Sequence, residues 1–139
     1  MSALRTIRVV EFAEGVAGPL AALRLADLGA DVIKVETPSG DQMRPLPDVF
    51  DASNRGKRDV VIDLKTPEGL EAARRLVATA DVVTHNLRPG KADKLGIGYE
   101  ALKAIKPDLV YLYLPGYGSK GPKSLLKAFA PLISGWVGL

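Results

Sequence analysis

The sequence predicts an α/β protein built on an open parallel sheet with flanking helices. Short runs rich in Val and Ile recur along the chain, and each is too short to form a helix. Residues typical of helix starts and helix ends separate these runs. A helical connection between two buried strands implies a right-handed β–α–β crossover, which makes the two strands parallel.

The first such unit covers residues 7–36. Strands are expected at 7–12 (IRVVEF) and 31–35 (DVIKV), and the helix between them opens at Gly18-Pro19 and stops at Gly29. Pro19 suits a first helical position because its missing N–H needs no partner there. Gly29 suits the left-handed residue just beyond a helix end. The loop 13–18 then follows the carboxyl end of a strand, where open α/β sheets bind ligands.

The remaining chain continues the alternation of strands and helices. Thr66-Pro67-Glu68 provides an N-cap, a first-turn Pro and a first-turn acid, which indicates a helix start. Residues 37–58 are rich in Pro, Gly, Asp and Ser without a usable period, and a long loop is expected there. Further strands are expected at 59–63, 81–84 and 109–114, and further helices at 91–95, 99–105 and 124–139.

Composition restricts the class of protein. Hydrophobic residues make up 47% and charged residues 25%, as in ordinary globular domains. The absence of Cys excludes disulfides and Cys-ligated metal and fits a reducing compartment. No leader and no apolar run of about 20 residues is present, so a cytoplasmic protein without a membrane partner is expected. The net charge of +3 is spread thinly, which disfavours nucleic acid and suits a small polyanionic ligand.

Two features, one after each of the first two strands, could indicate nucleotide binding. Gly15 and Gly18 would let a ligand approach the backbone closely, although their spacing does not match G-x-G-x-x-G and a tight turn would also need small residues. Glu36 stands where dinucleotide-binding folds keep the acid that holds a ribose hydroxyl. Because the glycine fingerprint is absent, a solvated acid is the favoured interpretation of Glu36.

Several cations could neutralise phosphate or simply face solvent. Arg88 offers a planar fork after a strand, and Lys94 follows one turn later, whereas Asn86 could merely cap its own turn. The single histidine, His85, is expected to pack or form a hydrogen bond rather than act as a base. No metal-ligand cluster or nucleophile elbow stands out. The other candidate cations are Arg44, Arg55, Lys57, Arg58 and Lys65.

An ordered set of motifs runs unbroken from about residue 4 to residue 122: AGP, LADLGADVIKVE, GDQMR, NRGKRDVVIDLKTPEG, ADVVTHNLRPG and KLGIGYEALKAIKPDLVYLYLPGYGSKGP. This set resembles the amino-terminal domain of the family III CoA-transferases. The family includes formyl-CoA and carnitine CoA-transferases and α-methylacyl-CoA racemase. The resemblance implies a Rossmann-like CoA-binding domain over residues 1–122. An apolar helical segment, 123–139, would lead into a remainder of the protein beyond this sequence.

The resemblance also implies ligands, partners and site residues. The substrates would be an acyl-CoA and a carboxylic acid acceptor, and the full-length protein would form an interlocked homodimer. No residue of this chain matches a catalytic or metal-binding position. Residues matching the family's CoA contacts are Gly15, Val16 and Ala17 near the thioester and pantetheine, Lys65, Asn86, Leu87, Arg88 and Lys94 along CoA, and Tyr117 near the acyl end.

Three departures from the family pattern shape the functional expectation. Thr37 stands where the family often has an Arg that meets an adenosine phosphate, so that contact is lost or comes from Arg44. The GHD-type motif of the racemase branch is replaced by Leu126-Lys127-Ala128. The catalytic Asp, which forms an acyl anhydride and then a CoA thioester, is expected beyond Leu139.

The leading hypothesis is therefore the CoA-binding part of an acyl-CoA transferase that is inactive on its own. A racemase fragment and a non-catalytic CoA-binding or assembly module are the alternatives, and an NAD-binding domain is a more distant one.

Overall fold

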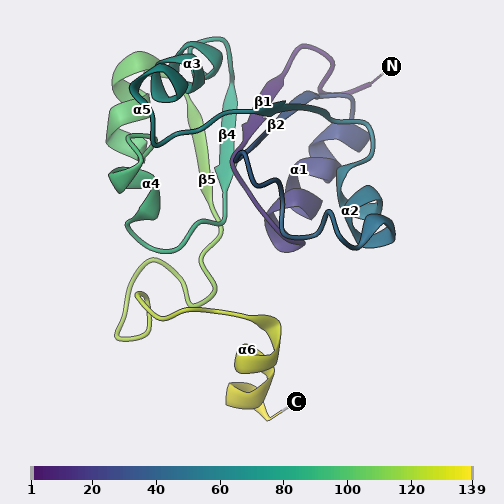
Figure 1. The fold of residues 1–139 in the computed structure, drawn as a ribbon, viewed down its shortest axis with the longest axis vertical. Coiled ribbons are helices and arrows are strands. Elements are labelled where there is room, and N and C mark those ends of the chain that lie inside the picture. The colour runs from purple at the N-terminus through teal and green to yellow at the C-terminus, as the bar shows by residue number, and fades with distance from the viewer. Residues whose placement is uncertain (1, 139) are drawn as a thin grey trace.

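A five-stranded, fully parallel sheet with strand order β3-β2-β1-β4-β5 forms the centre of the molecule (Figure 1). The computed structural model describes residues 2–138. The strands are β1 (Arg8–Glu11), β2 (Asp31–Glu36), β3 (Arg58–Val61), β4 (Val82–His85) and β5 (Val110–Tyr113). Each lies within about a residue or two of its predicted range, and the predicted α/β open parallel sheet is confirmed.

Helices cover both faces of this sheet. On one side lie α1 (Ala17–Asp27) and α2 (Pro47–Asn54), and on the other lie α3 (Pro67–Val77), α4 (Lys91–Lys94) and α5 (Tyr99–Ile105) (Figure 1). Since alternate residues of a strand face opposite sides, Val9 packs with Ala22 under α1, whereas its neighbour Val10 packs with Leu102 under α5. Each face of the sheet therefore has its own apolar core.

The strand order creates one crevice. The chain runs outward from β1 to β2 and β3 and then returns to place β4 on the other side of β1. The loops that follow β1 and β4 therefore diverge from a shared point, which is where open α/β sheets bind ligands. The loop 13–18, predicted to face a crevice, follows β1 at this point.

Two predicted helix boundaries are explained by the expected residues. The Thr66 hydroxyl caps α3 by accepting the Gly69 N–H at 3.0 Å. Gly29 has a φ of 95°, the left-handed conformation predicted beyond α1. Helix α1 itself begins at Ala17, slightly before the predicted opening at Gly18-Pro19, and Pro19 still lies among the first-turn positions whose N–H lacks a helical partner.

The prediction of a long loop over residues 37–58 is wrong for its second half. Pro47 and Asp48 begin α2, a helix that contacts α1 and buries Ser53 and Asn54. Pro47 and Asp48 are first-turn residues of the kind found in α3, but the helix buries Ser53 and Asn54 rather than an apolar stripe, so no hydrophobic period marks it. Tertiary contacts with α1 decide the structure of this segment.

The prediction of one helix over residues 124–139 is also wrong. Only α6 (Ala130–Val137) is helical, and it stands apart from the sheet (Figure 1). A helix continuing through Pro131 would lose a hydrogen bond and clash with the carbonyl of residue 127, so the helix begins just before this Pro. Leu139 lies outside the described residues.

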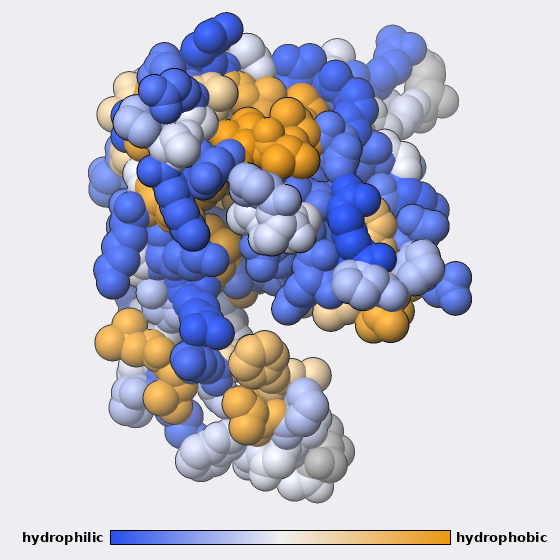
Figure 2. Space-filling model, viewed as in Figure 1, coloured by the Kyte–Doolittle hydropathy of each residue, from blue (hydrophilic) through white to orange (hydrophobic). Residues whose placement is uncertain are grey.

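Apolar side chains are exposed on this carboxyl-terminal part, as Figure 2 shows. Leu125 is 80% exposed, Phe129 54% and Trp136 62%. Helix α6 is apolar, but it has only 8 residues. Within residues 2–138, no helix combines the length and hydropathy needed to cross a bilayer.

The buried core predicts a contrast between two Leu residues. Leu102 is completely buried between the sheet and α3, so Leu102→Ala should lower the free energy of unfolding by about 2–5 kcal/mol. Leu125→Ala, the same change at an exposed position, should alter it by less than about 0.5 kcal/mol. Urea denaturation followed by circular dichroism measures both, and equal effects would contradict the assignment of the core.

Candidate functional site

The loop after β1 and the loop after β4 are joined by one side chain. Through Oδ1, Asn86 accepts the Glu14 N–H at 2.9 Å, and through Nδ2 it donates to the Glu14 carbonyl at 2.7 Å. The Asn86 side chain therefore satisfies both the backbone N–H and the backbone carbonyl of Glu14. Gly18 is needed beside it, because a Cβ there would lie 2.4 Å from the Ala13 Cβ and 3.1 Å from the Asn86 side chain. The two loops form one unit at the crevice.

A first cleft of about 470 Å³ opens at the carboxyl ends of β1, β2 and β3. Its walls combine apolar side chains with hydroxyls and charges of both signs. Lys65 and Lys91 supply cations, and the carboxylates come from Glu14, Glu36 and Asp63. Its apolar lining consists of Phe12, Val35, Pro38, Ile62, Leu64, Leu87 and Leu95. Such a cleft suits a flat heterocycle that bears polar substituents at its rim.

A second cleft of about 750 Å³ lies along the glycine loop. It shares Glu14, Leu87 and Lys91 with the first cleft, so the two clefts adjoin, and together they are called the groove below. Its cationic side chains are Arg88, Lys91 and Lys127, set against the single carboxylate of Glu14. The second cleft is therefore the more favourable of the two for an anion.

Most of the predicted site residues line this groove. Lys65 lines the first cleft, Leu87 lines both, and the second cleft is lined by Gly15, Val16, Ala17, Asn86 and Arg88. Lys94 and Tyr117 line neither cleft. The sequence thus predicts a set of residues from separate loops that the fold brings together, with two exceptions.

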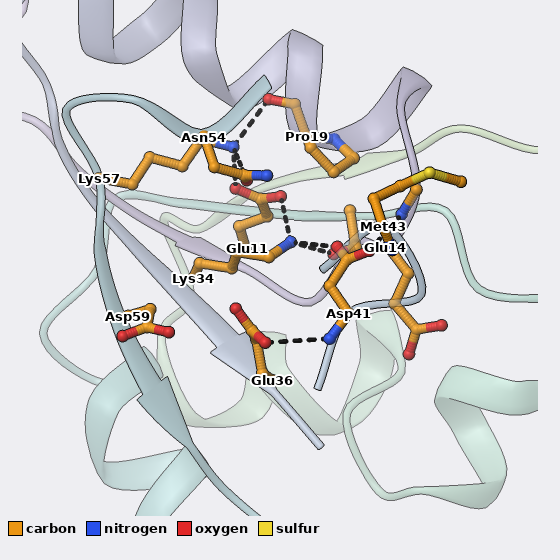
Figure 3. A network of polar contacts seen from close by, with 12 residues as sticks. Glu11, Glu14, Pro19, Lys34, Glu36, Asp41, Met43, Asn54, Lys57 and Asp59 are labelled. Atoms are coloured by element: carbon orange, nitrogen blue, oxygen red, sulfur yellow. Dashed lines mark hydrogen bonds and ion pairs between the residues drawn. The ribbon is translucent and has the colours of Figure 1, made fainter. Parts of the chain in front are cut away.

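Beneath the glycine loop lies a network of buried charges (Figure 3). The Lys34 Nζ lies 3.3 Å from a Glu11 carboxylate oxygen and donates to the Ala13 carbonyl at 2.9 Å. The Lys57 Nζ donates to the other Glu11 oxygen at 2.7 Å and to the Pro19 carbonyl at 2.8 Å. The side chains of Glu11, Lys34 and Lys57 are at most 2% exposed. Lys57 is therefore neither a solvated cation nor a phosphate ligand.

Asp41 completes the network. Its side chain is fully buried, and its carboxylate lies 2.8 Å from the Lys34 Nζ. The same carboxylate accepts the N–H of Gly15 at 3.2 Å and of Met43 at 2.9 Å. Burial opposes ionisation of Asp41, but the hydrogen bonds from Lys34 and from Met43 outweigh it and hold its pKa below the usual value.

The expectation that Glu36 is a solvated acid is wrong. Glu36 is 4% exposed and accepts two hydrogen bonds of 2.7 Å from the Arg44 guanidinium and one of 3.0 Å from the Asp41 N–H. Burial favours the neutral form, yet these donors lower the pKa of Glu36 below its ordinary value. Arg44 also pairs with Asp59, so both carboxylates compete for its charge.

His85 has the structural role that the sequence indicates. Its Nδ1 accepts the Leu87 N–H at 3.2 Å, and its ring stacks on Tyr113 with centroids 4.6 Å apart. Burial lowers the pKa of His85 to about 4. The imidazole is neutral at physiological pH and fixes the start of the 86–90 turn.

Sequence reasoning missed the buried charges and one lining residue. Glu11 and Lys34 interrupt strands that are buried on both faces, and a charge at such a position is itself a signal of a paired network. Lys91 lines both clefts, but the sequence pattern indicates only that it begins a short helix. Within residues 2–138, no three His, Cys, Asp or Glu side chains are grouped to hold a metal ion.

The neutral, buried His85 predicts a pH-dependent stability. The unfolded chain binds a proton near the ordinary pKa of 6.5, whereas the folded chain does so only near 4. The contribution of neutral His85 to the free energy of unfolding is therefore fully present above the unfolded-state pKa of 6.5. It falls as the pH decreases, by about 2 kcal/mol at a pH of about 5. Urea denaturation at pH of about 7 and about 5 measures this loss, and His85→Gln should lack it. As the chain has one His, an imidazole NMR titration reads the pKa directly, and a value near 6.5 would contradict the prediction.

Comparison with known proteins gives the family. The chain matches the model of CoA-transferase family III over residues 4–139. It is 43% identical over 150 residues to the succinate–glutarate CoA-transferase of Agrobacterium fabrum, which covers 97% of this chain and 38% of that protein. It is 38% identical over 135 residues to the formyl-CoA:oxalate CoA-transferase of Streptomyces coelicolor, covering 91% of this chain and 33% of that protein.

A solved structure shows the same fold. The crystal structure of a CAIB/BAIF family protein from Brucella suis superposes with a TM-score of 0.94 at 44% identity, covering 99% of this chain and 39% of that one. The chain thus spans between 33 and 39% of the length of these three proteins. On the family match, the sequence identity and the shared fold together, the chain belongs to CoA-transferase family III.

Proposed function

We propose that this chain is the CoA-binding part of an acyl-CoA transferase. The observation that carries the proposal is the groove at the β1/β4 switch point, in which residues matching the family's CoA contacts come together from three separate loops, those after β1, β3 and β4. A groove that joins a mixed-polarity cleft to a cationic one suits an elongated ligand with a heterocycle, phosphates and a polar arm. CoA has these parts in this order.

The first cleft would take the nucleotide end of CoA. Phe12, Ile62 and Leu95 provide apolar contact for the adenine ring. Lys65 and Lys91 stand at the cleft as charge partners for phosphate. The carboxylates of Glu14 and Asp63 suit ribose hydroxyls, the groups that acids hold in related α/β sites.

The second cleft would take the pantetheine arm and the thioester. Helix α1 begins at this cleft, and no acceptor among residues 2–138 takes the N–H of Val16, Ala17 or Gly18. Free N–H groups in the first turn of a helix are donors for a carbonyl oxygen or for a negative charge that develops on it. Arg88, next to the shared residue Leu87, would meet the phosphates where the two clefts adjoin, and Lys127 adds positive charge to the second cleft.

The whole protein would move CoA between two carboxylic acids. In the proposed reaction, an Asp carboxylate outside this sequence attacks the acyl-CoA carbonyl and expels the CoA thiolate, which leaves an acyl anhydride. The thiolate then attacks the aspartyl carbonyl, releases the acyl group as a carboxylate and forms an aspartyl-CoA thioester. The curated relatives described above are named as CoA-transferases, which supports this reaction over racemisation. We propose that residues 1–139 bind CoA without turnover, and that an interlocked homodimer in the cytoplasm is the working form.

Binding of CoA by the chain is the direct test. Isothermal titration calorimetry should give a saturable isotherm with CoA and a weaker one with pantetheine, which lacks the nucleotide phosphates. Lys65→Ala and Arg88→Ala should each weaken CoA by about tenfold and pantetheine much less, because each removes a charge-assisted contact to phosphate.

The matched control for these two variants is Lys106→Ala. This change removes the same charge from the loop after α5, outside both clefts, and should leave the CoA affinity unchanged. Tighter binding of NADH than of CoA by the unaltered chain, or equal losses for CoA and pantetheine, would contradict the proposal.

Two Lys residues of one short helix give a second test. Lys91 and Lys94 both lie in α4, but only Lys91 lines the groove. Lys91→Ala should therefore weaken CoA by about five- to tenfold, while Lys94→Ala should change the affinity by less than about twofold. The two variants have the same net charge, so a difference reports position alone. The reverse order would favour the family-derived assignment of Lys94.

A further inference from the structure

One buried carboxylate connects the glycine loop to the segment that folds over it. Asp41 follows β2, and its Oδ1 accepts the N–H of Gly15 and of Met43, while its Oδ2 pairs with Lys34. Figure 3 shows Asp41 between β2 and the loop after β1. A single side chain therefore joins the loop after β1, its own segment and strand β2.

The glycine loop depends on this acceptor. Gly15 is buried with a φ of 79°, and a Cβ at this position would lie 2.7 Å from the Gln42 side chain. The Gly15 N–H is thus covered by the neighbouring segment and excluded from water. A buried N–H without an acceptor is costly, and Asp41 supplies the acceptor.

The rest of the charge network holds the two ends of the same loop. Lys34 donates to the Ala13 carbonyl at its start, and Lys57 donates to the Pro19 carbonyl in the first turn of α1. Between these anchors lie the N–H groups of Val16, Ala17 and Gly18, which face no acceptor among residues 2–138. The buried charges fix the two ends of the loop, and Val16 and Ala17 between them line the second cleft with their N–H groups unbonded among residues 2–138.

We propose that Asp41 is a positioning residue that holds the Gly15–Gly18 backbone ready for the pantetheine and thioester half of CoA. This inference rests on the proposed CoA-binding function. Asp41 lines neither cleft, so it acts through Gly15 and Lys34 rather than by contact with the ligand. A backbone that is already ordered before binding avoids the entropy cost of ordering it in the complex.

The nucleotide half should not depend on Asp41. The turn Thr37–Gly40, which lines the first cleft, is closed by its own hydrogen bond from the Gly40 N–H to the Thr37 carbonyl at 2.8 Å. Glu36 is held by Arg44 and by the backbone N–H of residue 41, which any side chain retains. Loss of the Asp41 carboxylate therefore leaves this wall of the first cleft supported.

The test compares Asp41→Ala and Asp41→Asn in the 139-residue chain. Affinities for pantetheine, CoA and the nucleotide half of CoA (adenosine bisphosphate) are measured by NMR titration and calorimetry. Asp41→Ala should weaken pantetheine and CoA by about tenfold and the nucleotide half by less than about twofold. Asp41→Asn keeps an acceptor for Gly15 but loses the charge that faces Lys34, so it should lie between the unaltered chain and Asp41→Ala.

A matched control and a ligand-free readout separate the outcomes. Asp81→Ala removes a carboxylate that accepts the Arg8 N–H at 2.8 Å, at the amino-terminal ends of the strands and so away from the groove, and should leave all three affinities unchanged. In the absence of ligand, the Gly15 amide should exchange with solvent faster in Asp41→Ala than in Asp81→Ala, with Asp41→Asn between the unaltered chain and Asp41→Ala.

Unchanged pantetheine affinity, or an equal loss for both halves of CoA, would overturn the positioning role. If the unaltered chain binds no CoA, the proposed function fails and with it the ligand assignment. The exchange of Gly15 still decides whether Asp41 holds the loop, and an unchanged rate would refute that as well. If Asp41→Ala does not fold, Asp41→Asn provides the same comparisons.

Discussion

The structure depends on a buried cluster of ion pairs, in which the positive and negative side chains balance one another, at the ends of β1 and β2. At the last register position of the central strands, Glu11 of β1 pairs with Lys34 of β2, and both side chains are buried. Lys57 and Asp41 complete two positive and two negative groups, each with a partner of opposite sign within 3.3 Å. Removing one member would leave an uncompensated buried charge, which typically costs about 3–5 kcal/mol. This cost constrains all four positions together.

These buried ion pairs explain how the loop after β1 keeps one fixed conformation. Loops are usually the mobile parts of an α/β sheet. Here the loop after β1 is held from below by the Lys side chains and Asp41, and from the side by Asn86, which binds both backbone groups of Glu14. Capping of its own turn is one interpretation of Asn86 from the sequence, but its side chain joins two loops across the switch point. The glycine loop and the 86–90 turn are therefore joined to each other and to the sheet by hydrogen bonds.

The sequence predicts the parts of the fold that follow from local pattern. Strands rich in Val and Ile, the Thr66 cap and the Gly29 terminus require only local chemistry, and these predictions hold. Helix α2 was missed because it buries Ser53 and Asn54 rather than an apolar stripe. The helix predicted over 124–139 is too long because Pro131 allows a helix only to begin beside it, not to pass through it. For the candidate site, the resemblance predicts residues from three loops that line the groove, while the pairing of Glu11, Lys34, Asp41 and Lys57 depends on strand register, which no single segment reveals.

The same pairings bear on how phosphate charge could be met where Thr37 replaces the Arg common in the family. Arg44 was considered as the substitute cation, but its guanidinium is shared between Glu36 and Asp59. Two carboxylates against one guanidinium leave this corner of the molecule with a net negative charge, which repels phosphate rather than attracting it. The cations that remain at the groove are Lys65 in the first cleft, Lys91 in both, and Arg88 and Lys127 in the second. A bound polyphosphate would therefore lie nearest the junction of the two clefts, where Lys91 belongs to both, and away from the end of β2.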